Sequence, residues 1–290
     1  MSWVEEAYYL RLPSGSPMQG DIWSNLPQPY SPSPLCAGLV ITPRCDLVHD
    51  KTLTANYLPL FPIDEFMETR GHHELLEQGL HDAKELLLRA ADLLGVKGAV
   101  ELELPMELLT QTLTENPSAR ASELGIPLHR YQKLADDFWE AERRIDAIGA
   151  LLLQPRVEAT QLTQRCNPKS LRKYKLALAR NTVSDLHFLP PCRDLLLTPC
   201  VISLRDVATC SVDLLRIAGN CMSQCEWNAS RSQQSTPDFK ATSVKPERLL
   251  RLKTPYLEHL MSRFGALFGR VGVRDMSASQ LEAYVGLREL

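Results

Sequence analysis

The feature that most constrains the fold is a change in hydrophobic period near residue 65. Before it, short apolar runs such as 38–43 and 56–63 are bounded by proline, glycine or polar clusters and are rich in β-branched and aromatic residues, as strands are. Beyond it, apolar residues recur every three or four positions, which is the spacing of an amphipathic helix: Leu76, Leu80, Ala83, Leu87, Ala91 and Leu94. Strand-like runs return after residue 184.

This order of strands, helices and strands predicts an α+β fold in which both ends of the chain build one small β-barrel or sheet. We divide the sequence into N-terminal barrel strands, a large helical insertion, C-terminal barrel strands with a packing helix, and a C-terminal tail, at 1–63, 64–184, 185–274 and 275–290. Further helices of the insertion are expected at 105–114, 127–153 and 167–181.

The C-terminal part is expected to contain strands, a loop and one helix. Strand signals lie at 186–191, 194–210 and 211–218. Residues 228–247 are polar and predict a mobile loop. The segment 254–273 begins with Thr254, a typical helix cap, and carries a strong apolar face, which predicts a packing helix.

The composition is that of an ordinary globular chain. Of 290 residues, 44% are hydrophobic and 23% are charged, and no apolar stretch approaches the roughly 18 residues that a transmembrane helix needs. The first residues lack a basic segment followed by an apolar one, so we expect no signal peptide, a cytoplasmic location and no membrane partner. The eight cysteines are then expected to be reduced thiols.

Two of these cysteines, Cys221 and Cys225, are close enough in sequence to share a metal ion. A zinc site needs two further ligands, which Cys192, Cys166 or His187 could supply only through the fold. Because no second tight pair is present, we favour buried or idle thiols and expect no cofactor.

Residues 44–46 directly follow an apolar run and are the first candidate for a chemical site. In a catalytic or ligand-binding interpretation, Arg44 favours the thiolate of Cys45, Asp46 orients a partner and His49 supplies a base. In the alternative, Asp46 fixes a turn through nearby backbone N–H groups and Cys45 fills a small apolar slot. We favour a turn-forming or binding role over a catalytic one.

Charge is segregated along the chain, although its net charge is only -3. Residues 64–153 hold 18 acids and 9 bases, whereas 154–184 hold 7 bases and 1 acid, and 240–274 hold 8 bases and 2 acids. Basic surfaces of this kind bind phosphate groups, or they dock on the acidic part of the chain. The candidate nucleic-acid contacts are Arg165, Lys169, Arg172, Lys173, Lys175, Arg248, Arg251 and Lys253, with Arg180, Arg263, Arg270 and Arg274 nearby.

For two further patterns we favour a structural interpretation over a functional site. On a helix, His73, Glu77 and His81 share one face that could bind a divalent metal, but a solvated polar face is favoured. The segment 118–138 has the outline of a helix-turn-helix, yet it lies in the acidic part of the chain, so we favour a helix hairpin over a DNA reader.

Three N-terminal segments, at 20–23, 38–42 and 57–63, resemble the strands of the PemK/MazF-type small barrel of toxin–antitoxin ribonucleases. That resemblance implies a small β-barrel. These toxins place a catalytic Arg in the loop entering the second strand, and the corresponding loop here, at 30–37, contains no Arg. The departure argues against a toxin-like ribonuclease activity.

The whole layout also resembles a diffuse, largely uncharacterised group of bacterial barrel proteins. The resemblance rests on Cys-Asp-Leu at 45–47, a Leu-Pro strand at 186–190 and the closing helix at 256–272. Such proteins resemble components of mobile or defence-related gene clusters, so this resemblance implies a cellular setting.

Together, these patterns favour a non-catalytic adaptor or regulatory subunit of a bacterial anti-phage defence or toxin-like system, binding a protein or nucleic-acid partner. The large insertion, the missing toxin Arg and the charge segregation support this interpretation. The alternative is an enzyme, either a nuclease or a thiol-dependent hydrolase, that uses the 44–46 loop.

Overall fold

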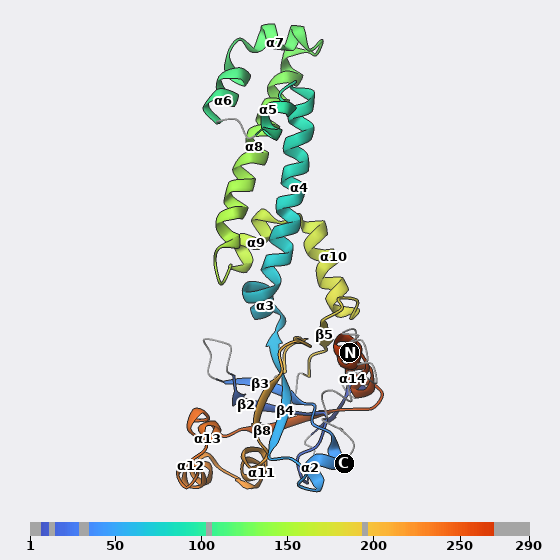
Figure 1. Cartoon of the computed structure of the whole chain (residues 1–290), viewed down its shortest axis with the longest axis vertical. Helices are drawn as coiled ribbons and strands as arrows, with labels where there is room; N and C mark the ends of the chain where they lie inside the picture. Colours follow the sequence, from blue (N-terminus) through green and yellow to red (C-terminus); the bar gives the residue numbers. More distant parts are fainter. Residues whose placement is uncertain (1–6, 12–14, 29–34, 103–105, 193–196, 270–290) are drawn as a thin grey trace, which may run out of the picture. The chain divides into compact units, whose positions relative to one another are not determined.

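The computed structural model describes residues 7–11, 15–28, 35–102, 106–192 and 197–269. The chain divides into two compact units (Figure 1). The sheet unit joins Met1–Phe61 to Asn181–Leu290, and the helical unit is Pro62–Arg180; the sequence analysis places the insertion at 64–184. The predicted tail at 275–290 lies outside the described residues, and so do Arg270 and Arg274 of the second basic segment.

The sheet unit contains one antiparallel sheet that curves into a half-barrel. Its hydrogen-bonded order is β1-β8-β2-β3-β4-β6-β5, and β7 also pairs with β4. Strand β8, from the C-terminal part, thus lies between two N-terminal strands, so both ends of the chain build the sheet as predicted. The strands are β1 (Tyr9–Arg11), β2 (Asp21–Pro27), β3 (Leu35–Val40), β4 (Thr54–Pro62), β5 (Leu186–Leu189), β6 (Cys200–Ser203), β7 (Ala208–Ser211) and β8 (Glu247–Leu252).

Neighbouring residues of the central strands fill two different cores, because successive side chains of a strand point to opposite faces. Ile22 and Leu39 face a core that α14 (Tyr256–Gly269) covers. Trp23 and Val40 face a second core with α11 (Val212–Asn220), α12 (Gln224–Ser232) and α13 (Pro237–Ala241). Helix α14 is the packing helix predicted at 254–273.

Residues 212–218 lie in α11 and Ser211 ends β7, so the prediction of a strand over 211–218 was wrong for all but its first residue. The Ser211 hydroxyl accepts a hydrogen bond from the Leu214 N–H at 3.2 Å and caps the helix. Asp213 stands in the first turn, where the helix dipole favours a negative charge. Val212, Leu215 and Ala218 recur at every third position and are all buried.

Residues 228–247, predicted as a mobile loop, contain most of α12 and all of α13 instead. Trp227 and Phe239 anchor these helices: their rings stack at 5.6 Å, and both side chains are buried. The Trp227 Nε1–H donates to the carbonyl of Thr242 at 3.3 Å. Two buried aromatic rings thus hold an otherwise polar segment against the sheet.

The helical unit is built around two long helices, α4 (His72–Leu93) and α8 (Leu128–Leu152), which pack side by side (Figure 1). Gly125, at φ 66°, turns the chain between α7 and α8, so the segment 118–138 forms a helix hairpin. Among the described helices, none is long and apolar enough to cross a membrane. The other elements of this unit are α3 (Ile63–Phe66), a π-helical turn (Met67–Gly71), α5 (Lys97–Glu101), α6 (Met106–Thr114), α7 (Pro117–Glu123), α9 (Ala159–Arg165) and α10 (Pro168–Ala179).

Candidate functional site

The first sequence candidate, at residues 44–46, forms one short helix, α2 (Arg44–Val48). Cys45 is exposed, and its thiol donates a hydrogen bond to Oδ1 of Asp46 at 3.3 Å. The His49 N–H donates to the Cys45 carbonyl at 3.2 Å, but among the described residues no side-chain contact joins the imidazole to the thiol. Leu47 is the residue that the turn buries.

This geometry supports a structural turn more than a nucleophile. The described side-chain partner of the thiol is the carboxylate of Asp46 and not the imidazole of His49, which the catalytic interpretation needs as a base. The expectation that Cys45 fills an apolar slot does not match its exposure. Leu47 fills that role instead, because it is 2% exposed.

We therefore expect Cys45→Ala to change the free energy of unfolding by less than about 0.5 kcal/mol, because the side chain is exposed. Urea unfolding measures this change. A hydrolytic activity that the wild type shows and that this variant loses at unchanged stability would contradict the structural interpretation.

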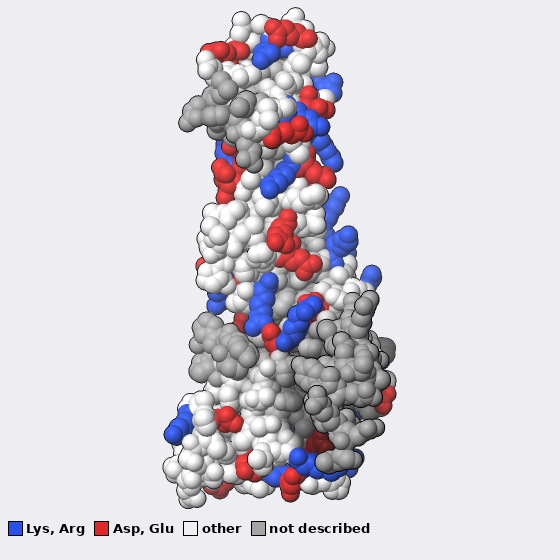
Figure 2. Space-filling view, viewed as in Figure 1, with Lys and Arg blue, Asp and Glu red and all other residues white. Residues whose placement is uncertain are grey.

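The first basic segment lies on α10, which contains no acidic residue. The helix buries Leu178 and turns its opposite side to solvent. Figure 2 shows Lys and Arg side chains at the edge of the molecule where Figure 1 draws α10. The exposed basic face consists of Lys169, Arg172, Lys173 and Lys175, continued by Arg180 after the helix and by Arg165 at the end of α9.

Two observations distinguish this basic face. The Asn167 side chain caps α10 by accepting a hydrogen bond from the Lys169 N–H at 2.9 Å, so a rigid helix presents the charges. Among the described residues, none of the four cations on α10 forms an ion pair with a carboxylate. They are therefore available to an anionic partner.

The second basic segment is different, because Arg248 and Arg251 are only 11% and 18% exposed. Both bind Asp21, a fully buried carboxylate: Nη1 of Arg248 lies 3.3 Å from Oδ2, and Nε of Arg251 lies 2.5 Å from Oδ1. Oδ2 also accepts the Met18 N–H at 2.8 Å. These two guanidinium groups, predicted as nucleic-acid contacts, thus have an internal partner.

A break in strand register places the two arginines together. Arg251 lies opposite Asp21 and Arg248 lies opposite Trp23, and the register shifts between these pairs. Without the shift, residues three apart on a strand would face opposite sides of the sheet. A bulge of this kind redirects side chains, and here both guanidinium groups reach the same carboxylate.

Two further residues of the second segment also bond to other parts of the sheet unit. Arg263 of α14 donates to the carbonyl of Leu186 at 2.7 Å, and Lys253 is half-buried, with its N–H donating to the Tyr8 carbonyl. His187 lies 3.3 Å from Nη1 of Arg263. Burial, and then the charge of Arg263, lower the pKa of His187 to about 3, so its imidazole stays neutral.

The metal candidates are not brought together. His73 pairs with Glu77 at 3.3 Å, whereas His81 pairs with a different residue, Glu85. Cys221 is buried and Cys225 is exposed. In the described part of the chain, no three or more His, Cys, Asp or Glu side chains are grouped so that they could hold a metal ion.

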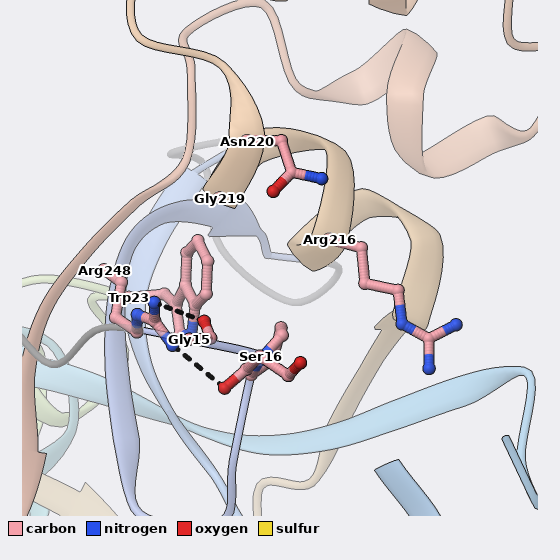
Figure 3. A pocket seen from close by; sticks show the side chains of 8 residues that line it. Gly15, Ser16, Trp23, Arg216, Gly219, Asn220 and Arg248 are labelled. Atoms are coloured by element: carbon pink, nitrogen blue, oxygen red, sulfur yellow. Dashed lines mark hydrogen bonds between the residues drawn. The ribbon is translucent and has the colours of Figure 1, made fainter. Parts of the chain in front are cut away.

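A pocket of about 560 Å³ opens in the sheet unit, and Arg248, one of the two arginines that bind Asp21, lines it (Figure 3). Its wall includes Trp23 of β2, Arg248 of β8, and Gly219 and Asn220 at the end of α11. The Arg248 guanidinium lies 5.5 Å from the centre of the Trp23 ring, a cation–π distance, and it also donates to the Gly15 carbonyl at 2.7 Å.

Known proteins do not identify this site. No protein-family model, no curated protein and no solved structure matches the chain. The chemistry of the described residues therefore carries the functional argument.

Sequence reasoning missed the pocket, because its wall comes from segments about 200 residues apart. One signal was present: Asp21 begins a strand whose next two residues, Ile22 and Trp23, are apolar. A buried acid in a strand needs a cationic partner. The sequence alone does not show which Arg or Lys is the partner of Asp21.

Proposed function

We propose that this chain is a non-catalytic adaptor that binds the backbone of a nucleic acid through the basic face of α10. The observation that carries the proposal is the row of exposed cations, Lys169, Arg172, Lys173 and Lys175, on a helix without acidic residues. Residues three or four apart on a helix lie about 5–6 Å from one another, so the row can follow successive phosphates. Each contact releases counterions, which supplies the binding energy.

A shallow hollow on α10 supports a single strand as the preferred form. It has a volume of about 360 Å³ and is lined by the apolar residues Pro168, Leu171 and Leu176, with Arg172 and Lys175 beside them. Apolar surface flanked by cations suits an unpaired base joined to its phosphates. In duplex DNA the base faces are stacked and cannot enter such a hollow.

The resemblance to bacterial defence-related proteins supports a setting in a multi-component anti-phage or toxin-like system. There the chain would hold a nucleic acid and leave its cleavage to a partner protein. The enzymatic alternative has weaker support, because the thiol of Cys45 is bound to Asp46 and no side-chain contact with His49 is among those described.

The proposal predicts strongly salt-dependent binding by the wild-type protein. Four phosphate contacts on a single strand give a slope of about -3 in a plot of log affinity against log salt concentration, at roughly 0.7 per contact. Fluorescence anisotropy with labelled oligonucleotides of unrelated sequence measures this slope. Affinity that does not change with salt, or no binding at low salt, would contradict a phosphate-bearing partner.

A further inference from the structure

The cluster around Asp21 carries an excess of positive charge. Arg248 and Arg251 share this one buried carboxylate, and among the described residues no other acid pairs with either guanidinium. Two positive charges and one negative charge leave a net charge of +1 in a poorly solvated place. A buried charge without a counterion is costly, so this arrangement favours an anion nearby.

Two hydrogen-bond donors of the same region also have no acceptor in the described structure. They are Nη2 of Arg251 and Nε1 of Trp23, both fully buried atoms. Arg248 has five N–H donors, and its described bonds to Gly15, Ser16 and Asp21 occupy three of them. Arg251 does not line the pocket, so the donors within reach of a ligand there are the remaining N–H groups of Arg248, which suit an acceptor-rich ligand.

The pocket offers such a ligand a place. Arg248 and Trp23 lie on one side of it, and Asn220 extends from the end of α11 on another (Figure 3). Asn220 is exposed, and its side-chain amide has no partner among the described residues. None of the described lining residues is an acid. Arg216, which also lines the pocket, is already bound to Asp50 and to the Leu47 carbonyl.

We propose that this pocket binds a small phosphate-bearing molecule of the nucleoside monophosphate class, with its phosphate at the Arg248 side. The inference is independent of the nucleic-acid surface on α10, because the pocket belongs to the sheet unit. A guanidinium and a side-chain amide are suitable donors for phosphate oxygens.

The size and the wall of the pocket argue for a nucleoside attached to that phosphate. About 560 Å³ is far more than inorganic phosphate fills and is typical of small-molecule sites. Gly219 has no side chain, and a Cβ built there would lie 3.6 Å from Cη2 of Trp23. The absence of a side chain at this position keeps this part of the pocket wall open, which leaves room for the nucleoside.

Titration of the full chain with ribonucleoside 5′-monophosphates tests the proposal. In ¹⁵N-resolved NMR spectra, the Trp23 indole N–H signal, assigned with Trp23→Phe, should shift saturably. Inorganic phosphate and the uncharged nucleosides are the comparison probes. Equal affinity for inorganic phosphate would overturn the nucleoside assignment, and equal affinity for an uncharged nucleoside would overturn the anion assignment. No saturable shift at millimolar concentrations would overturn both.

Two variants connect the binding to the pocket. Gly219→Leu places a side chain toward Trp23 without backbone strain, so it should abolish the shift and not lower the melting temperature. Asn220→Asp should weaken binding about tenfold or more, because it adds a carboxylate to the wall of a pocket that binds an anion. Asn228→Asp, at an exposed position of α12, is the matched control and should bind like the wild type. Unchanged binding in Gly219→Leu would place the ligand elsewhere and overturn the proposal.

Discussion

Asp21→Ala is expected to lower the free energy of unfolding by about 3–5 kcal/mol, one of the largest single effects in this chain. The carboxylate is 0% exposed and accepts hydrogen bonds from Arg248, Arg251 and the Met18 N–H. Without it, two mostly buried guanidinium groups repel each other and lose their acceptor. The cost is that of uncompensated buried charge, and urea unfolding of the full chain measures it.

Asp213→Ala is the control for this prediction. Asp213 is 70% exposed, and its nearest approach to Arg216 is 3.9 Å. An exposed pair of this kind contributes about 0–1 kcal/mol, so this variant should remain close to the wild type. If Asp21→Ala lowers the free energy of unfolding no more than Asp213→Ala does, Asp21 does not compensate the charges of Arg248 and Arg251 in the way that the structure indicates.

The architecture could be predicted because long periodic segments determine it. The stripe from Leu76 to Leu94 can only be a helix, and the strand-like runs on either side of the insertion leave one sheet as the simplest arrangement. The relationship to the PemK/MazF-type barrel stays a prediction. What the structure shows is the coarser result, an α+β chain with an antiparallel half-barrel sheet.

Short segments were harder to predict, for two physical reasons. Apolar runs of about eight residues, such as 211–218, fit a strand and a helix equally well, and the Ser211 cap decides between them. Strand β8 escaped prediction because its bulge breaks the alternation of apolar and polar residues: Arg248 and Arg251 face one carboxylate although they are three residues apart.

Only the part of the candidate site that comes from one continuous segment of the sequence could be predicted. The basic face of α10 comes from one segment, so sequence placed Lys169, Arg172, Lys173 and Lys175 together. The second basic segment looked similar in sequence, yet burial against Asp21 distinguishes it. That difference depends on a partner some 230 residues away, which local patterns do not reveal.

The most direct test of the proposed function is a charge reversal on α10: Arg172→Glu, Lys173→Glu and Lys175→Glu in one variant. Loss of three phosphate contacts lowers the salt slope by about 2 units and, with the added repulsion, weakens affinity on the order of 100-fold or more. All three side chains are exposed, so the fold should be retained. The readout is the anisotropy of a labelled single-stranded oligonucleotide as a function of salt concentration.

The matched control reverses three exposed cations elsewhere in the helical unit, Lys84, Arg130 and Lys133, and changes the net charge by the same amount. We expect this control to keep most of the wild-type affinity and slope, while the α10 variant loses most of both. Equal losses in the two variants would show that binding follows net charge alone, and undiminished binding by the α10 variant would show that its basic face is not the nucleic-acid surface.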